Sequence, residues 1–308
     1  MTALLPDAHR ANWVDRYAPR SVQPWLKLGR FDRPAGIWLL MLPGWQGVAL
    51  ACAQQGRWPA LWPLLAVFLG AALMRSAGCA YNDIVDRDID AQVARTALRP
   101  IPAGQIGVRG AIAYVVVVSL VSLAILVTLG LPAILLGVAS LALVAAYPFM
   151  KRITWWPQAW LGLTFNWGAL LGYAAVAERV SLSAVLLYAG GVAWTLGYDT
   201  IYAIQDLEDD ALVGVKSSTR RLGSRVREAV LGFYILAFIL AVAAAWTANL
   251  GPLFLPLAGA YALHISIQAS KVDLEDGAKA LRLFKSNAVA GLILFAALIA
   301  GMWRPAGL

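Results

Sequence analysis

The chain has 308 residues, of which 60% are hydrophobic and only 14% are charged, and its mean hydropathy is +0.68. Because a soluble domain is about a quarter charged, this composition excludes the soluble class and indicates a membrane protein. The net charge of +8 does not indicate nucleic-acid binding, since the basic residues are spread over several loops between apolar runs. The two cysteines lie in apolar runs and the two histidines are isolated, so we expect neither a disulfide framework nor a zinc site.

Residues 1–33 carry six basic residues and no apolar stretch as long as the core of a signal peptide. We therefore expect no cleaved signal, with the first spanning helix acting as the insertion signal. Residues 14–31 mix aromatic, aliphatic and basic side chains, which is typical of a helix at a membrane surface. Pro19 and Pro24 interrupt that segment, so an irregular tail is an equal alternative. The expected organisation is a cytoplasmic or interfacial segment, 1–33, followed by a single transmembrane domain, 34–308.

Nine apolar runs approach the length of about 20 residues that a membrane-spanning helix needs. In chain order the predicted spans are 34–53, 58–80, 110–130, 132–149, 157–177, 183–204, 229–248, 251–269 and 286–303. Closely spaced runs are separated at Gly130-Leu131-Pro132 and at Gly251-Pro252, which are turn signals. The predicted fold is all-α, a polytopic bundle of nine transmembrane helices around a central cavity.

The basic residues predict the orientation of the bundle. Of the 25 lysines and arginines, only Arg57, Arg179 and Arg304 fall in loops on the side opposite the N-terminus. Basic loops remain on the cytoplasmic side of a membrane, so we expect a cytoplasmic N-terminus and a multi-pass protein of the cell inner membrane.

Two short acidic clusters stand where apolar runs end, after the second and sixth predicted spans. The first runs from Asn82 to Asp90, and the second from Asp206 to Asp210, with Asp199 shortly before it. Carboxylates are costly near hydrocarbon, so repeated clusters there indicate a bound cation or a functional path. Each cluster is followed by a basic-hydroxyl pair, Arg95-Thr96 and Lys216-Ser217. This pattern indicates a weak internal repeat, with two similar helical halves facing each other across one site on the cytoplasmic side.

The spacing within the clusters suits metal binding. If the helices continue, Asn82, Asp86 and Asp90 lie on one helix face, as do Asp206 and Asp210 on another. Asp83 lies about 100° round from that face, which favours a place behind the metal ligands or pairing with a neighbouring base. Mg²⁺ prefers such oxygen ligands and often shares them with a substrate phosphate. The candidate metal ligands are Asn82, Asp83, Asp86, Asp90, Asp206 and Asp210.

A membrane enzyme with a diphosphate site at helix ends needs a substrate with a polar head and an apolar tail. A polyprenyl diphosphate has that shape, and metal ions stabilise the charge that develops on the departing diphosphate. The allylic carbon becomes cation-like, and the ring faces of nearby aromatic side chains stabilise a cation. Tyrosines near the predicted cytoplasmic helix ends are Tyr81, Tyr147, Tyr198 and Tyr202.

These motifs resemble a known family. Asn82-Asp83-x-x-Asp86-x-x-x-Asp90, followed by Arg95-Thr96 and Arg99-Pro100, is similar to the first signature of the UbiA superfamily of intramembrane prenyltransferases. Tyr198-Asp199 through Asp206, with Asp209-Asp210 and Lys216-Ser217, resembles the second signature. The segments Arg30-Phe31-Asp32-Arg33-Pro34 and Tyr147 to Gln158 extend the resemblance, which covers about residues 25 to 300 and is most similar to the branch that prenylates 4-hydroxybenzoate in ubiquinone synthesis.

The resemblance implies a cytoplasm-facing Mg²⁺ site that joins a polyprenyl group to the ring carbon ortho to the hydroxyl of 4-hydroxybenzoate. By matching motif, Asn82, Asp86, Asp206 and Asp210 would hold Mg²⁺ and diphosphate. Arg95, Lys151 and Lys216 would help to hold the diphosphate. The acceptor's carboxylate needs a cation, for which Arg33 is the first candidate and Arg152 the second. Asp199, deeper in its helix, would orient or deprotonate the phenol, or would instead pair with a neighbouring helix.

Two other functions fit part of the pattern. A prenyltransferase of the same superfamily with haem, a naphthoate or homogentisate as acceptor shares the aspartate clusters, although the motifs of the first and fifth spans argue against it. A cation-coupled transporter also uses internal repeats and buried carboxylates, but transporters place their binding residues near mid-membrane.

Overall fold

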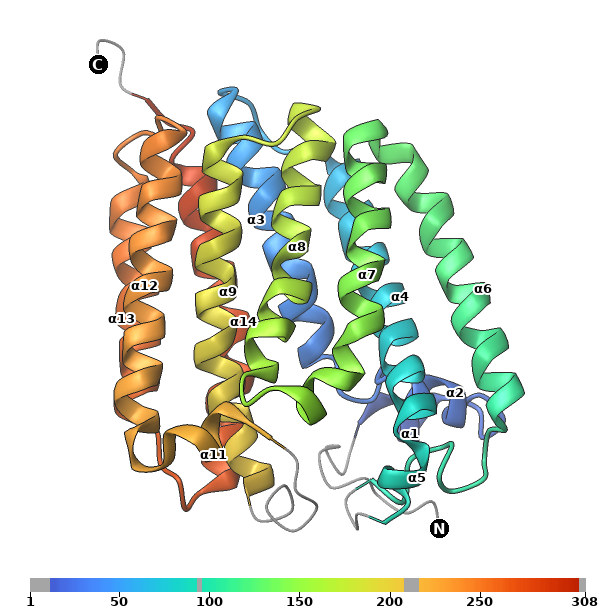
Figure 1. The fold of residues 1–308 in the computed structure, drawn as a ribbon. Coiled ribbons are helices and arrows are strands. Elements are labelled where there is room, and N and C mark those ends of the chain that lie inside the picture. Colours follow the sequence, from blue (N-terminus) through green and yellow to red (C-terminus); the bar gives the residue numbers. More distant parts are fainter. Residues whose placement is uncertain (1–11, 93–95, 208–215, 305–308) are drawn as a thin grey trace. The chain divides into compact units, whose positions relative to one another are not determined.

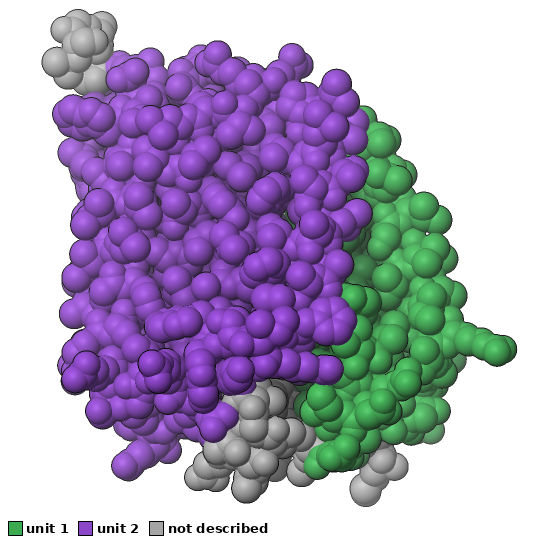
Figure 2. Space-filling view, in the orientation of Figure 1, with its two compact units in different colours: residues 1–38, 68–128 green, residues 39–67, 129–308 purple. Residues whose placement is uncertain are grey.

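The computed structural model describes residues 12–92, 96–207 and 216–304, which are helices and connecting loops without a strand (Figure 1). The chain divides into two compact units, each built from two separate stretches of sequence (Figure 2). Unit 1 comprises Met1–Trp38 and Phe68–Thr128, and unit 2 comprises Leu39–Val67 and Leu129–Leu308.

The elements divide between the units as follows. Unit 1 holds α1 (Trp13–Tyr17), α2 (Gln23–Leu28), α5 (Arg87–Asp90) and α6 (Val108–Leu126). Three elements contribute residues to both units, namely α3 (Ala35–Gln54), α4 (Leu61–Val85) and the short 3₁₀ helix η1 (Val127–Leu129). Unit 2 holds α7 (Leu131–Ile153), α8 (Pro157–Ala177), α9 (Leu182–Tyr202), η2 (Ala203–Asp206), α11 (Ser218–Leu222), η3 (Gly223–Arg225), α12 (Val226–Thr247), α13 (Phe254–Ser270) and α14 (Gly277–Ala300).

Each predicted span coincides with a long helix among the described residues, namely α3, α4, α6, α7, α8, α9, α12, α13 and α14. Helices α3, α4, α6, α7, α14 and the α11–α12 segment are long and apolar enough to cross a membrane. Helix α13 has only 17 residues, and α8 and α9 carry amide, hydroxyl and aromatic side chains that lower their hydropathy. A multi-pass membrane protein is therefore supported, whereas nine spans around a central cavity and a cytoplasmic N-terminus stay predictions.

The largest differences from the predicted spans lie at two polar helix ends. Helix α4 continues five residues past the expected end of its span, to Val85, and α14 begins at Gly277 rather than 286 because the side chain of Asp276 caps it. Hydropathy misses both extensions, since they are polar. Residues 14–31 form two short helices instead of one, and Pro19 lies between them.

Unit 2 is a helix bundle in which neighbours in sequence are neighbours in space. Helix α9 packs against α8, α12 and α14, while α7 packs on α8 and α13 packs on both α12 and α14 (Figure 1). Its interior is filled by large side chains that are almost fully buried, including Trp194, Tyr173, Tyr198, Tyr234 and Tyr261. Helix α9 is therefore central to this unit, and the second acidic cluster begins just beyond its end.

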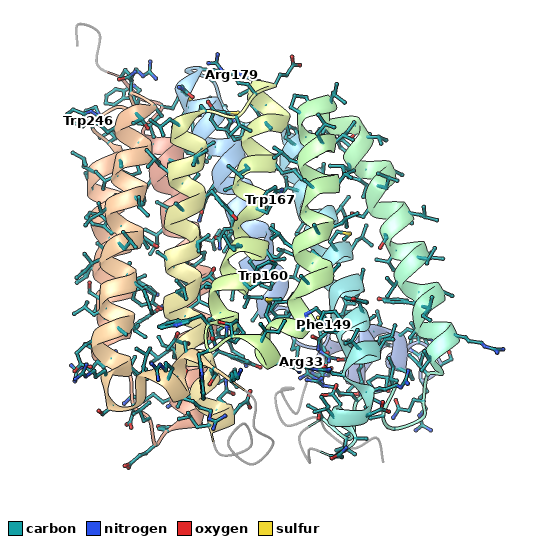
Figure 3. All side chains as sticks on the ribbon, viewed as in Figure 1. Arg33, Phe149, Trp160, Trp167, Arg179 and Trp246 are labelled. Atoms are coloured by element: carbon teal, nitrogen blue, oxygen red, sulfur yellow. The ribbon has the colours of Figure 1, made fainter. Side chains whose placement is uncertain are left out.

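Two tryptophans of α8 fasten it to α7. The ring N–H of Trp160 donates to the Leu143 carbonyl at 2.9 Å, and that of Trp167 donates to the Leu136 carbonyl at 2.8 Å (Figure 3). At one end of unit 2, Trp246 is 83% exposed and lies on the same side as Arg179 (Figure 3). An exposed tryptophan at a helix end is typical of the interface between hydrocarbon and water.

Helices α3 and α8 approach each other through small residues. A Cβ atom placed on Gly172 would lie 2.2 Å from the Gly44 carbonyl oxygen, and one on Gly47 would lie 2.1 Å from the Ala169 carbonyl oxygen. Such contacts are the means by which helices associate in lipid, where no hydrophobic effect drives them together.

Gly172→Ala is therefore expected to destabilise the protein by about 1–3 kcal/mol, because the added methyl group forces the two helices apart. Thermal unfolding of the purified protein in detergent measures the loss. Gly259→Ala is the matched control, since a Cβ at Gly259 of α13 meets no atom within 4 Å and alanine is the better helix former. Equal melting temperatures for the two variants would contradict the close approach.

Unit 1 has a smaller core formed by Leu28, Ala80, Ile101, Ile106 and Ala111. This core packs α2 and the loop before α6 against α4. The loop that follows the first acidic cluster is thus held by apolar contacts, which places its polar residues beside the end of α4.

Candidate active site

The first acidic cluster lies at the end of α4 and over a bend in the chain. Asn82 and Asp83 belong to the last turn of α4, and the helix ends one residue before Asp86, whose φ and ψ are −96° and 3°. Asp90 closes the short helix α5. Backbone N–H groups of Asp86 and Asp90 still bond to the carbonyls four residues earlier, at 2.9 and 2.8 Å. The i to i−4 hydrogen bonds from Asn82 through Asp86 to Asp90 therefore continue across the bend, although α4 does not run through it.

The carboxylates of this cluster are deeply buried. Asp83 and Asp86 have no exposed surface, and Asp90 is 5% exposed. The guanidinium of Arg30 donates from Nη2 to both oxygens of Asp83, at 2.7 and 2.8 Å. Arg99 Nη1 donates to Asp83 at 3.1 Å and to Asp90 at 2.6 Å. Two of the predicted metal ligands, Asp83 and Asp90, thus already accept charged hydrogen bonds.

Arg30 precedes α3 and remains cationic in this buried place. Burial alone lowers the pKa of Arg30, but the charge of Asp83 and the hydrogen bonds to it outweigh that effect and raise the pKa above its usual value. Since both partners are charged, their hydrogen bonds are of the strong, charge-assisted kind. Sequence reasoning did not single out Arg30, whose partner lies 53 residues away in the chain.

Arg33, the first candidate for the acceptor's carboxylate, lies in the same unit just before α3 (Figure 3). Its Nη2 atom is 3.3 Å from Asp32 Oδ2, and its side chain is 17% exposed. Among the described residues the Asp32 oxygens accept no hydrogen bond, although that carboxylate is fully buried. The guanidinium of Arg75 packs directly on Gly36 at the start of α3. A Cβ atom placed on Gly36 would lie 2.7 Å from Arg75 Nε.

The second acidic cluster belongs to unit 2. Helix α9 ends at Tyr202 and tightens into η2, which ends at Asp206, so the second cluster begins in a 3₁₀ turn rather than in a continued α-helix. Asp199 and Asp206 are half-buried. Asp210 and Arg95 lie outside the described residues.

The loop after the second cluster brings two predicted diphosphate-binding residues together. The backbone N–H of Lys216 donates to the Lys151 carbonyl at 3.2 Å, and the Lys216 ammonium donates to the Ile153 carbonyl at 3.2 Å. Arg152 is exposed. The two lysines therefore belong to one basic edge formed by the end of α7 and the start of α11.

Buried hydroxyl groups hold this edge to α9, and sequence reasoning missed them. The hydroxyls of Ser218 and Thr200 are 2.7 Å apart, and Thr219 Oγ1 donates to the Thr200 carbonyl at 2.7 Å. The backbone N–H of Ser218 donates to Gln158 Oε1 on α8 at 3.0 Å. The loop is therefore fixed to α8 and α9 by groups that are buried and satisfied.

The aromatic side chains near the end of α9 form a cluster of tilted and edge-on rings. The ring centroids of Tyr202 and Phe284 are 4.5 Å apart, and those of Tyr198 and Phe284 are 5.8 Å apart. Tyr198 also lies edge-on to Trp194 at 5.1 Å and is only 1% exposed. Tyr198 therefore belongs to the core, whereas the half-buried Tyr202 remains the better candidate for contact with a prenyl cation.

A family model described as the UbiA prenyltransferase family matches residues 40–302. The chain belongs to this family. The 4-hydroxybenzoate polyprenyltransferase, mitochondrial, of Arabidopsis thaliana is 43% identical over 292 residues, which cover 94% of this chain and 72% of the relative. The human protein of the same name is 42% identical over 291 residues, which cover 93% of this chain and 78% of the relative.

Solved structures of other UbiA homologues share the fold. The apo structure of a homologue from Aeropyrum pernix K1 is 29% identical with a TM-score of 0.72, over 86% of this chain and 98% of that chain. A homologue from Archaeoglobus fulgidus, solved with GPP and Mg²⁺, has a TM-score of 0.69 at 19% identity, over 91% of this chain and 99% of that chain. At that identity the likeness concerns the fold alone.

The oxygen donors of this UbiA chain fit Mg²⁺. The amide of Asn82 and the carboxylates of Asp86 and Asp206 are hard ligands, and Mg²⁺ is commonly held by one or two carboxylates together with substrate phosphate. Over the described ranges, no three His, Cys, Asp or Glu side chains gather into a cage for a metal. This donor set therefore suits an ion that arrives with a diphosphate. That both clusters contact one diphosphate stays a prediction.

Proposed function

We propose that this protein transfers a polyprenyl group from a polyprenyl diphosphate to 4-hydroxybenzoate and depends on Mg²⁺. The bond between the allylic carbon and the diphosphate oxygen breaks, and a carbon–carbon bond forms at the ring position ortho to the hydroxyl. The ring loses the proton from that carbon, and diphosphate leaves. The observation that carries the proposal is the 42–43% identity, over more than nine-tenths of the chain, to relatives named 4-hydroxybenzoate polyprenyltransferase.

Each proposed role rests on the chemistry of the side chain and its place in the fold. Asn82, Asp86, Asp206 and Asp210 hold the magnesium diphosphate, in which the metal stabilises the charge on the leaving group. Arg95, Lys151 and Lys216 bind diphosphate oxygens, and the basic edge shared by the two lysines supports that role. Arg33, with Arg152 as the alternative, binds the acceptor's carboxylate, and Asp199 orients or deprotonates its phenol.

The distribution of basic residues supports a location in the cell inner membrane with the site facing the cytoplasm. Arg57, Arg179 and Arg304 lie on the other side of the predicted topology, and the remaining basic residues lie with the acidic clusters.

Membranes that contain the protein, supplied with Mg²⁺ and a radiolabelled prenyl diphosphate, are expected to prenylate 4-hydroxybenzoate and release diphosphate. A panel with a hydroxynaphthoate, homogentisate and haem tests the other acceptors, and membranes without the protein are the control. Preferential transfer to one of those compounds would show that 4-hydroxybenzoate is not the acceptor. Cation-dependent uptake without any prenyl product would support a transporter instead.

A further inference from the structure

Asp83 forms ion pairs with two arginines from distant segments of the chain. Arg30, in the loop before α3, binds both carboxylate oxygens of Asp83, and Arg99, in the loop before α6, binds one of them. The Asp83 side chain is 1% exposed, and the arginine side chains are 9% and 16% exposed. Its oxygens therefore already serve two strong donors inside the protein.

Arg99 also spans the bend at Asp86. Its Nη1 atom binds Asp83 on α4 at 3.1 Å and Asp90 on α5 at 2.6 Å. The hydroxyl of Thr96 donates to the Asp90 carbonyl at 2.7 Å and fixes the same end of α5. Asp86 thus lies between two anchored carboxylates, on the one residue that separates α4 from α5.

Further hydrogen bonds and an ion pair connect Arg30 to the N-terminal helices. Arg30 Nη1 donates to the Lys27 carbonyl at 3.0 Å, and the Lys27 ammonium pairs with Asp15 at 2.6 Å. The ring N–H of Trp13 donates to the Phe31 carbonyl at 2.7 Å. Helices α1 and α2 are therefore tied to the loop that carries Arg30, and Arg30 links them to the end of α4.

Charge balance separates this cluster from the metal and diphosphate. The two arginines and the two aspartates cancel, so together they offer no net attraction to Mg²⁺ or to diphosphate. A cation placed at Asp83 would also meet two guanidinium groups at close range, which disfavours it. The cluster instead resembles the outer hydrogen-bond partners that orient ligand-bearing segments around metals.

We propose that Arg30, Asp83, Arg99 and Asp90 form a positioning clamp, which holds the bend at Asp86 so that Asn82 and Asp86 present their oxygens to the magnesium diphosphate. None of the four clamp residues touches metal or diphosphate. This inference rests on the proposed function, because it assigns to the clamp the geometry of that metal site.

The test measures metal binding rather than turnover. Mn²⁺, a paramagnetic stand-in for Mg²⁺, is titrated into the purified full-length protein with an unreactive prenyl thiolodiphosphate, and free Mn²⁺ is followed by electron paramagnetic resonance. Asp83→Asn and Arg99→Gln are each expected to weaken Mn²⁺ binding about 10- to 100-fold without changing the number of ions bound. Arg99→Lys keeps the positive charge but loses the two-pronged guanidinium, so its Mn²⁺ affinity is expected to lie between those of the wild type and Arg99→Gln. Arg109→Gln, an exposed arginine of the same unit, is the matched control with unchanged binding.

The decisive measurement is a double-mutant cycle. If Arg99 acts only through the clamp, Asp83→Asn combined with Arg99→Gln weakens Mn²⁺ binding no more than the worse single variant. If the fold-losses in Mn²⁺ affinity of the two single variants multiply in the double variant, Arg99 binds the diphosphate directly. If Asp83→Asn binds fewer ions than the wild type, Asp83 is a metal ligand. Either result overturns the proposal.

Removing one member of a buried ion pair leaves a buried charge, so a single variant can fail to fold. If Asp83→Asn does not give a monodisperse protein, the double-mutant cycle is measured with Asp90→Asn and Arg99→Gln, and its result decides the proposal by the same criteria. Mn²⁺ binding does not depend on the acceptor. If the enzyme prefers another acceptor, the Mn²⁺ result is unaffected. If instead the clamp does not position the metal site, Arg99→Gln and Arg99→Lys bind Mn²⁺ as tightly as the wild type.

Discussion

Asp86→Ala is expected to lower kcat/KM for prenyl transfer by about 1,000-fold, because a metal that neutralises a departing diphosphate supplies several kcal/mol of transition-state stabilisation. The side chain is fully buried, at the bend between α4 and α5, and it is the aspartate of this cluster whose carboxylate we assign to the metal. The measurement is the initial rate of 4-hydroxybenzoate prenylation by purified enzyme over a range of Mg²⁺ concentrations.

Asp88→Ala is the matched control within the same motif. Its side chain is 83% exposed and pairs only loosely with Arg87, at 3.4 Å, across a contact that is worth little on a surface. We expect Asp88→Ala to keep nearly full activity. Chelation of Mg²⁺ by EDTA is expected to abolish the activity of the wild type. Full activity in EDTA, or equal losses in Asp86→Ala and Asp88→Ala, would rule out the assigned metal site.

The sequence predicts the long helices well because lipid leaves few alternatives. Backbone groups in hydrocarbon must be satisfied within the segment, so an apolar run of sufficient length becomes a helix. The errors lie at polar ends. Hydropathy stops short of Gly277 and Val85, where the Asp276 cap and the buried cluster after α4 extend helices beyond the apolar run.

The candidate site was predictable where spacing along the chain carries the signal. Asn82 and Asp86 are one helical turn apart, and that relation survives the end of α4. The hydroxyls of the two basic-hydroxyl pairs have different contacts: Thr96 Oγ1 donates to the Asp90 carbonyl, whereas Ser217 accepts from the Arg220 N–H and caps α11. The hydroxyls that bind α9 belong to the next two residues, Ser218 and Thr219.

The remaining contacts depend on how distant segments pack. Nothing in the sequence pairs Arg30 with Asp83, which lies 53 residues away, or Gln158 with the backbone of Ser218, which lies 60 residues away. Spacing placed Asp83 about 100° round from Asp86 and suited it to pairing with a base, and Arg30 and Arg99 are such partners. Spacing gave Asp90 the same standing as Asp86, and its bond to Arg99 follows only from the folded loop before α6.

Arg33→Met is expected to raise KM for 4-hydroxybenzoate about 10- to 100-fold while kcat and KM for the prenyl diphosphate change little. A charged hydrogen bond to a carboxylate is worth about 1.5–3 kcal/mol, and Arg33 is mostly shielded from water, where such a bond is least screened. Wild-type enzyme should also prefer 4-hydroxybenzoate to its uncharged amide, and that preference should disappear in Arg33→Met.

Because Asp32 is buried beside Arg33, Arg33→Met alone leaves a carboxylate without that partner. The double variant Asp32→Asn with Arg33→Met removes both charges and separates a folding defect from lost recognition, since it should fold like the wild type yet retain the high KM. Arg152→Met decides between the two candidate arginines. If the acid-over-amide preference survives in Arg33→Met and vanishes in Arg152→Met, the exposed arginine in the last turn of α7 binds the carboxylate, and Arg33 serves only as the counter-charge of Asp32.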